Sequence, residues 1–365
     1  MVWNWQLPDW PHFQYDSSSL TPLEKKFYQG AGGVFAILKH LDEEKKRHFI
    51  VDILSIEGEK SAEIEGELLQ RESLQSSIKR QFGLAHDEKR IPPKEQGMGA
   101  LMWTMYDTFD EPLSHEMLHE WHYLLMSHDH TLASVGNYRT HKEPMQIVSS
   151  RYDRQTIYFE APPSSQVDQE MSRYIDWFNQ SRNQESTLAR AGSAHAYFES
   201  IHPFEDGNGR IGRALVEKAL SQSLGQASLL AISQEISRRK KEYYTALGTC
   251  NRTLEIGTWL LFFANVIVHA QEESLALINF LLDKSKLLNS LKGKINSRQE
   301  KVLLRMFAEG RKGFTGGLSA KNYIAITKTT RATATRDLND LVEKGALYKI
   351  GTLKHTRYWL NIHPS

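Results

Sequence analysis

Hydrophobic residues recur at helical spacing through most of this chain. The pattern is strongest between a loop predicted at residues 85–97, where Pro92 and Pro93 interrupt it, and about residue 290. Ahead of that loop, Thr21-Pro22-Leu23-Glu24 has the form of a capping box with proline at the first helical position. We therefore expect a mainly α-helical chain, and we find no internal repeat at solenoid periods.

The helical periodicity is interrupted between Gly136 and Pro163. Two short runs, Met145-Gln146-Ile147-Val148-Ser149 and Thr156-Ile157-Tyr158-Phe159-Glu160, are joined there by a polar segment. Short runs rich in β-branched and aromatic residues on either side of a polar segment predict a β-hairpin.

The chain from about residue 290 has an organisation of its own. Helices are predicted over residues 299–308, 319–326 and 331–344, followed by a two-stranded hairpin within residues 346–360. This order resembles a winged helix, in which the third helix would contact DNA, although such modules also serve in protein docking or dimerisation. The candidate phosphate or base contacts are Thr329, Thr330, Arg331, Thr333 and Arg336.

Charge is divided unevenly along the chain. The formal net charge is only +1, from 45 basic and 44 acidic residues. Residues 284–365 hold 17 Lys and Arg against five Asp and Glu, a net charge of +12, so the preceding residues carry −11. The basic end favours a nucleic-acid or acidic-protein partner there.

Composition indicates a globular, intracellular protein. The length of 365 residues suggests two to three domains, and 40% hydrophobic with 24% charged residues is ordinary for a globular chain. The single Cys250 excludes an intramolecular disulfide and fits a reducing cytosol. No signal peptide is apparent, and the most apolar stretch, Trp259 to Ala270, is too short to span a bilayer. We expect a cytoplasmic protein that is not bound to a membrane.

The segment from His202 to Arg213, HPFEDGNGRIGR, carries the most informative chemistry. Its glycines and Asn208 favour a loop, and the residues from Arg210 onward have a helical pattern, so the loop opens into a helix N-terminus. Backbone N–H groups at a helix start, together with Arg210 and Arg213, form a site for phosphate groups. Asp206 is a suitable Mg²⁺ ligand, and His202 can accept a proton near neutral pH. A glycine-rich turn with surface arginines is the alternative interpretation.

The same segment matches the His-Pro-Phe-x-x-Gly-Asn-Gly-Arg-x-x-Arg motif of the Fic family, and the chain resembles a Fic protein adenylyltransferase. The resemblance implies transfer of AMP from ATP to a Ser, Thr or Tyr hydroxyl of a target protein that the sequence does not identify. Transfer of UMP, phosphate or phosphocholine also occurs in the family. In these terms His202 is the catalytic base and Asp206 holds Mg²⁺, and the residues that bind ATP are Gly207, Asn208, Gly209, Arg210 and Arg213.

A second segment resembles the inhibitory motif Ser-x-x-x-Glu-Gly of the same family. Here it comprises Ser61 and Glu65, which lie four residues apart and so share one face of a predicted helix. The resemblance implies that Glu65 pairs with Arg213, so that ATP binds in a pose unsuited to transfer. By composition alone this segment is a solvated acidic helix. Some relatives use the same glutamate to remove AMP, so the reverse reaction is an alternative.

Two further sets of site residues come from the resemblance. The predicted hairpin corresponds to the Fic flap, which holds a target segment by strand addition, and this places Ile157 and Tyr158 near the active site. Tyr243 and Asn251 match positions that contact the nucleotide. The alternative for the tyrosine is core packing.

One motif points to different chemistry. His115-Glu116-Met117-Leu118-His119 has the H-E-x-x-H spacing of zinc peptidases, without the further histidine that extends it in some of them. A zinc hydrolase is therefore one alternative function, and a DNA-binding regulator with the Fic core as a secondary module is another.

The expected architecture follows from these patterns. It is a mainly α-helical Fic bundle core with a β-hairpin flap and a small C-terminal winged-helix domain. Residues 1–95 would form an N-terminal helical region with an aromatic arm and the inhibitory motif, residues 96–285 the catalytic core, and residues 286–365 the winged helix. ATP, Mg²⁺, a target protein and DNA are the expected partners, and a homodimer is an open possibility.

Overall fold

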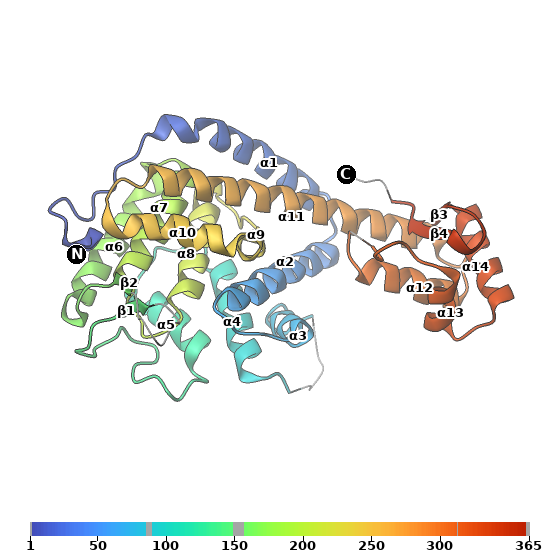
Figure 1. The fold of residues 1–365 in the computed structure, drawn as a ribbon, viewed down its shortest axis with the longest axis horizontal. Helices are drawn as coiled ribbons and strands as arrows, with labels where there is room; N and C mark the ends of the chain where they lie inside the picture. Colours follow the sequence, from blue (N-terminus) through green and yellow to red (C-terminus); the bar gives the residue numbers. More distant parts are fainter. Residues whose placement is uncertain (1, 85–89, 149–156, 312, 363–365) are drawn as a thin grey trace. The chain divides into compact units, whose positions relative to one another are not determined.

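A computed structural model describes residues 2–84, 90–148, 157–311 and 313–362. Most of this part of the chain is helical, and its strands form two small antiparallel sheets (Figure 1). The chain divides into two compact units, Met1–Ser274 and Leu275–Ser365. The predicted α-helical fold class is confirmed. The division into three domains stays a prediction, and the compact units divide before the predicted boundary at residue 286.

The first unit contains the motif and the helices and strands around it. They are α1 (Thr21–Lys39), α2 (Glu43–Ile64), α3 (Arg71–Gln81), α4 (Pro93–Asp107), α5 (His115–Met126), β1 (Gln146–Val148), β2 (Ile157–Glu160), α6 (Ser164–Gln180), α7 (Thr187–Ile201), α8 (Asn208–Leu224), α9 (Ile232–Arg238) and α10 (Lys240–Thr249). Helix α11 (Gly257–Leu291) begins in this unit and ends in the second. Short 3-10 helices occupy Asn4–Gln6, Ser17–Leu20, Ser181–Asn183 and Cys250–Arg252.

Helix α7 lies at the centre of this unit. Each of its residues except Glu199 is buried, and α8 packs along it. Gly192 allows α11 to approach closely, because a Cβ at this position would lie 2.6 Å from Leu260 Cδ2. The C-terminus of α7 and the N-terminus of α8 are therefore held by the core, and the loop between them is the motif.

Helix α2 packs against α3, α4, α8 and α9. Twelve of its residues are buried, among them the polar Ser55, Glu57 and Ser61. The helix that carries the predicted inhibitory segment is thus part of the core and not a solvated acidic helix. That alternative interpretation is wrong.

The predicted hairpin is present in the described residues. Strands β1 and β2 are antiparallel, with Gln146 opposite Glu160 and Ile147 opposite Phe159. Ser149, Thr156 and the residues between them lie outside the described part of the chain. The aromatic N-terminal arm covers the base of the hairpin, where Trp3 contacts Phe159 edge to face at 5.4 Å and Trp5 Nε1 donates to the carbonyl of Glu160.

Two local predictions are wrong. Helix α1 begins at Thr21, but the capping box does not form, because Glu24 accepts a hydrogen bond from Leu188 N at the start of α7 instead. The loop predicted over residues 85–97 ends early, since α4 starts at Pro93. Proline is tolerated in the first turn of a helix, where its missing N–H has no intrahelical partner.

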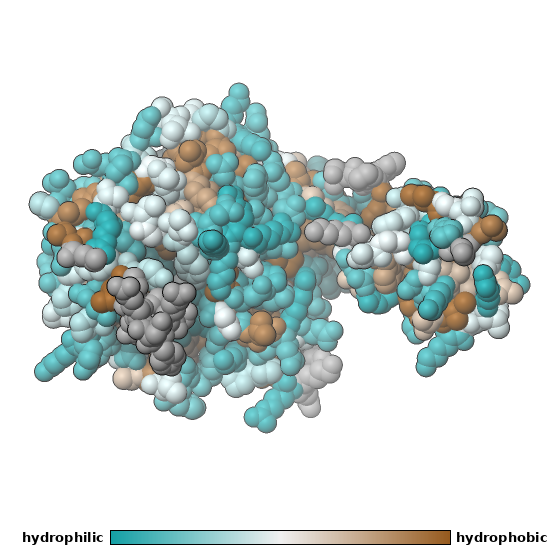
Figure 2. Space-filling model, in the orientation of Figure 1, coloured by the Kyte–Doolittle hydropathy of each residue, from teal (hydrophilic) through white to brown (hydrophobic). Residues whose placement is uncertain are grey.

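Helix α11 is much longer than its apolar stretch suggested. It spans 35 residues, and among the described residues it alone has the length and hydropathy of a membrane span, with half of that window buried in the structure. The apolar stretch from Trp259 to Ala270 is thus only one part of a helix that is long enough to cross a membrane by length and composition. Trp259, Phe263 and Ile267 are buried in the core, which accounts for the apolar composition. The face of the molecule drawn in Figure 2 is largely hydrophilic, with hydrophobic side chains in small separate patches.

The second unit has its own hydrophobic core. Its elements after α11 are α12 (Ser297–Ala308), α13 (Ala320–Thr327), α14 (Arg331–Glu343), β3 (Leu347–Ile350) and β4 (Arg357–Leu360), with a 3-10 helix at Leu353–His355. Val302, Leu338 and Leu341 are among its buried residues. The order of elements is the one predicted. Its assignment as a winged helix stays a prediction.

Candidate active site

The loop between α7 and α8 adopts a backbone that its sequence favours. His202 ends α7 in the left-handed region at φ 51°, and Gly207 precedes α8 at φ 84°, a conformation that favours glycine. The Asn208 side chain closes the loop on itself, since its Oδ1 accepts from Phe204 N at 2.9 Å and its Nδ2 donates to Phe204 O at 2.8 Å. Asn208 is thus buried and shapes the loop.

Arg139 lies outside the motif and binds the backbone of the loop. Its guanidinium is buried and donates to the carbonyl oxygens of His202, Ile201 and Pro162, and its backbone N–H donates to Pro203 O. The backbone on both sides of the His202 imidazole is therefore fixed.

Arg213 is engaged by the end of α2. Its Nε donates to Ser61 Oγ at 2.9 Å, its Nη2 to the Ser61 carbonyl at 2.8 Å and its Nη1 to Glu65 Oε1 at 2.8 Å. Burial opposes the charge on Arg213, but the carboxylate of Glu65 outweighs it and raises the pKa of the guanidinium. The structure brings Ser61, Glu65 and Arg213 together, as the family pattern implied.

Arg210 is engaged by a second carboxylate from the same segment. Its Nη1 donates to Glu67 in an ion pair, and its Nη2 lies 3.2 Å from Asp206 Oδ1. The other oxygen of Glu67 accepts from Lys94 Nζ at 2.9 Å. Both motif arginines are almost fully buried, so each positive charge has a carboxylate partner.

The turn at the end of α2 delivers both glutamates. The helix ends at Ile64, so Glu65 is its C-cap and not an interior helical residue as predicted. Gly66 has φ 86°, and Glu67 N donates back to Ala62 O. Gly209 makes room for the contact, because a Cβ there would lie 2.2 Å from Glu65 Oε1.

Comparison with known proteins agrees with this site. Residues 112–220 match the Fic/DOC family, and residues 3–84 match a domain of unknown function, DUF4172. This chain therefore contains a Fic domain. Protein adenylyltransferase fic-1 of Caenorhabditis elegans is 29% identical to it over 153 residues, and the Caenorhabditis briggsae protein of the same name is 27% identical over 153 residues. The match covers 40% of this chain and only 28% of the length of each relative.

Solved structures of Fic proteins share the fold. A Fic family protein from Desulfovibrio desulfuricans has a TM-score of 0.56 at 20% identity, and the match covers 96% of this chain and 98% of that one. A Fic domain containing signaling protein from Bacteroides thetaiotaomicron has a TM-score of 0.53 at 20% identity, over 71% of this chain and 95% of that one.

Asp206 is the candidate magnesium ligand of this Fic domain. Its side chain is half exposed and bonds to Gly207 N and Arg210. No group of three or more His, Cys, Asp or Glu side chains suited to a metal occurs among the described residues. Mg²⁺ needs no such group when a nucleotide supplies oxygens, since one or two carboxylates suffice. Asp206 therefore fits a magnesium ion brought in with ATP.

The residues predicted for the flap and for adenosine binding make fewer contacts with the motif. Ile157 and Tyr158 are exposed on β2, and Asn251 Nδ2 donates to the Tyr158 carbonyl at 3.4 Å. Tyr243 is buried, with its hydroxyl 2.6 Å from His195 Nε2, whereas the next residue, Tyr244, is 44% exposed. Nucleotide contact by Tyr243 and Asn251 stays a prediction, and Tyr243 acts in the core here.

The H-E-x-x-H segment is part of the Fic scaffold. His115 Nδ1 lies 2.9 Å from the Tyr138 hydroxyl, and no metal group forms there among the described residues. The neighbouring His122 is more informative. Burial lowers the pKa of His122 to about 4, and its Nδ1 accepts from Gly136 N, so its Nε2 carries the proton toward the Asp206 carbonyl. This histidine joins the loop at Gly136 to the motif.

Three contributors were missed by the sequence analysis: Glu67, Arg139 and His122. Glu67 lies two residues after Glu65, and its charge next to the predicted inhibitory glutamate was the available signal. Arg139 and His122 act through backbone contacts that no spacing rule gives.

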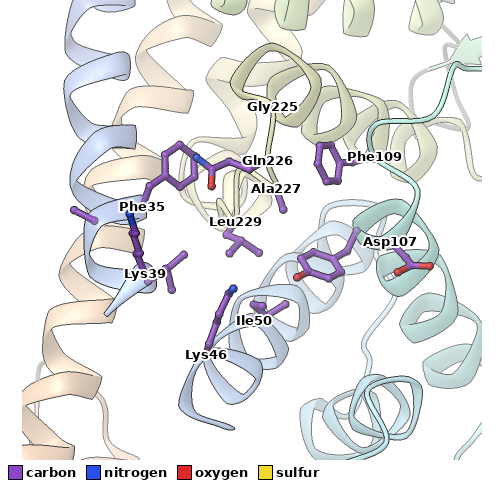
Figure 3. Close-up of a pocket in the computed structure, with 13 residues that line it drawn as sticks. Phe35, Lys39, Lys46, Ile50, Asp107, Phe109, Gly225, Gln226, Ala227 and Leu229 are labelled. Atoms are coloured by element: carbon purple, nitrogen blue, oxygen red, sulfur yellow. The ribbon is translucent and has the colours of Figure 1, made fainter. Parts of the chain in front are cut away.

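A cavity of about 680 Å³ lies outside the Fic motif (Figure 3). Lys39 of α1 and Lys46 of α2 line one side, and Phe109 lies across from them. None of its lining residues belongs to the motif or to the α2 turn.

Proposed function

We propose that this protein is an adenylyltransferase that transfers AMP from ATP to a Ser, Thr or Tyr hydroxyl of another protein. The observation that carries the proposal is a histidine at the end of α7 facing the same loop as two buried arginines and the N-terminus of α8. A helix start and two guanidinium groups suit a triphosphate, and an imidazole beside them suits proton removal. Two relatives named as protein adenylyltransferases match over 153 residues of this chain.

In this proposal His202 takes the hydroxyl proton as the oxygen attacks the α-phosphate. The bond from the α-phosphate to the bridging oxygen breaks, and pyrophosphate leaves toward the arginines. Magnesium, held by Asp206, would neutralise charge on the phosphates. Gly207 and Gly209 have no side chains that would keep phosphate oxygens away from the backbone of the loop.

We also propose that the enzyme is autoinhibited. Arg213 donates to Glu65, and Arg210 to Glu67, so neither guanidinium is free for phosphate oxygens in this state. Glu65 carries the inhibition expected from the family, and Glu67 adds a second ion pair, with Arg210.

The hairpin suits a role in target binding. Ile157 and Tyr158 are exposed on β2, and strand addition to a short two-stranded sheet would complete it. A target segment bound there would lie near Asn251, through its contact with the Tyr158 backbone.

The test is label transfer from ATP by the Glu65→Gly protein with Mg²⁺, supplied with ATP labelled at the α- or the γ-phosphate. The expected result is protein labelling from α-labelled ATP only, at least tenfold above wild type, and its loss in Glu65→Gly with His202→Ala. Glu63→Gln is the matched control, since Glu63 lies on the same helix end but bonds to Lys60 and Ser237. Labelling from the γ-phosphate, or labelling that survives His202→Ala, contradicts the proposal.

The second unit supports a separate candidate function, DNA binding. The outer face of α14 presents Arg331, Thr335, Arg336 and Asn339 to solvent. A groove of about 840 Å³ between α13, α14 and the hairpin is lined by Lys321, Arg331, Lys349 and Arg357, and no acidic residue is among the described residues that line it. Cationic and short polar side chains are the groups that contact phosphates and base edges.

A further inference from the structure

Buried polar atoms without partners gather behind His202. Within the described residues they are Glu199 Oε1, His195 Nδ1 and His202 Nδ1. Buried polar atoms in native proteins are nearly always hydrogen-bonded, so three in one place call for an explanation.

Glu199 and His202 face each other across one helical turn. Glu199 is in the last turn of α7, three residues before His202, and its Oε2 lies 3.6 Å from His202 Nδ1. The two side chains are only 12% and 14% exposed. A small rotation of either one would bring the pair within hydrogen-bond distance and satisfy the imidazole nitrogen.

Helix α8 leaves space for this carboxylate. A Cβ at Gly212 would lie 2.7 Å from Glu199 Oε1 and 3.1 Å from His195 Nδ1. Any other residue at position 212 would displace the carboxylate or the His195 ring. The glycine that separates the two motif arginines thus makes room for Glu199.

The Glu199 side chain is suited to be an anion. Burial by itself would raise the pKa of Glu199, but the nearby His202, His195 and Arg213 lower it below the ordinary value. A carboxylate next to an imidazole nitrogen accepts its proton and so fixes which ring nitrogen is free.

We propose that Glu199 is a positioning residue for the catalytic base: it accepts a hydrogen bond from His202 Nδ1–H and leaves Nε2 free to take the proton of the target hydroxyl. The backbone of His202 is already fixed by Arg139 and by its own N–H bond to Phe198 O, so side-chain rotation and tautomer are what remain to be set. When Nε2 takes the proton, Glu199 stabilises the resulting imidazolium. This inference rests on the proposed function of His202.

A competing role for Glu199 is that of a structural counter-ion to Arg213. Glu199→Gln tests the charge, since the amide keeps the shape and one acceptor oxygen. Glu199→Leu removes charge and acceptor together. Glu205→Gln is the matched control, because Glu205 lies three residues on the other side of His202 and its carboxylate accepts from Ala133 N, away from the imidazole.

The experiment places these variants in the Glu65→Gly background and measures kcat, the KM for ATP and the melting temperature. Nitrogen NMR of labelled histidine, assigned with His202→Ala, reports the His202 tautomer. We expect kcat to fall about 10-fold in Glu199→Gln and about 100-fold in Glu199→Leu, with the KM for ATP changed less than about twofold. The tautomer should shift from Nδ1–H toward Nε2–H in Glu199→Leu, and Glu205→Gln should match the parent.

An unchanged tautomer, or a kcat loss accompanied by an equal loss of ATP affinity and stability, would overturn the proposal in favour of the counter-ion role. If the Glu65→Gly parent transfers no AMP at all, the proposed function fails. The tautomer measurement still decides the role of Glu199 in that case.

Discussion

Two buried guanidinium groups define the site at the scale of single residues. A buried cation needs an anion, and in this protein Glu65 and Glu67 supply it to Arg213 and Arg210. Phosphate oxygens would compete for the same donors. Under the proposed autoinhibition, a protein carboxylate and a nucleotide phosphate would occupy the arginines in turn.

This exchange predicts how nucleotide affinity responds to the two glutamates. We expect Mg²⁺-ATP to bind about tenfold more tightly to Glu65→Gly than to wild type, and about tenfold more tightly again when Glu67→Gln is added, because each change removes one competing anion. Isothermal titration calorimetry of His202→Ala versions measures binding without turnover. Glu63→Gln should bind as wild type does. If Glu67→Gln adds nothing in either background, Arg210 is not a phosphate ligand.

At the scale of elements, α2 and α8 are joined by a buried pair of carboxylates. Glu57 of α2 accepts from Ser233 N, Glu217 of α8 accepts from Ser228 Oγ, and both side chains line one small cavity. Burial raises the pKa of Glu57 to about 7, and burial together with the charge of Glu57 raises that of Glu217 well above its ordinary value. Near pH 5 Glu57 is therefore protonated in the folded protein.

The raised pKa of Glu57 predicts a loss of stability with rising pH. The folded state binds a proton that the unfolded state releases above its ordinary pKa of 4.5, so the free energy of unfolding should fall from about pH 4.5 to about pH 7. We expect Glu57→Gln to flatten that slope and to stabilise the protein at pH 8 by on the order of 2 kcal/mol. Urea unfolding across this pH range measures both. Glu63→Gln is the control, and an unchanged slope in Glu57→Gln would contradict the assignment.

Element prediction from the sequence succeeded where local signals act alone. The runs around Ile147 and Phe159 are rich in β-branched and aromatic residues, and the helix over residues 331–344 has a clear hydrophobic face, so both were found. The start of α4 was missed because Pro92 and Pro93 look like helix breakers, although Pro93 opens the helix. Which of two adjacent tyrosines is buried depends on the 2.6 Å contact of Tyr243 with His195, and local sequence does not contain that information.

The site residues were likewise predicted where local sequence was sufficient and missed where tertiary contacts decide. The motif from His202 to Arg213 could be recognised because its functional residues lie within one short stretch of the sequence. Glu67, Arg139 and Glu199 act on that motif from elsewhere or through backbone groups, and only the packing of α2, α7 and α8 brings them to it. Spacing in one dimension cannot give such contacts.

On the scale of the whole molecule, charge separates the chain into an acidic and a basic part. Residues 284–365 carry +12 and the rest −11. A basic surface binds nucleic acid with a strength that falls as salt displaces condensed counterions. The cations of the α14 groove give this part of the chain the candidate contacts.

The charge division predicts salt-dependent DNA binding. Fluorescence anisotropy with a random-sequence duplex should show binding at about 50 mM salt that weakens at least tenfold by about 200 mM. Arg331→Gln with Arg336→Gln should reduce the salt slope. Lys344→Gln is the matched control on the same helix, since Lys344 is paired with Asp340. Absence of binding at low salt would instead favour a protein-docking role.

The aromatic arm has a practical consequence for every assay described above. Trp3 and Trp5 hold the base of the hairpin that is proposed to receive the target segment. A purification tag fused ahead of Trp3 therefore emerges beside that hairpin, where it can act as a tethered pseudo-substrate or a steric block. Preparations tagged at opposite ends of the chain are not equivalent reagents, and a difference in their activities would itself report on the route by which a target reaches the flap.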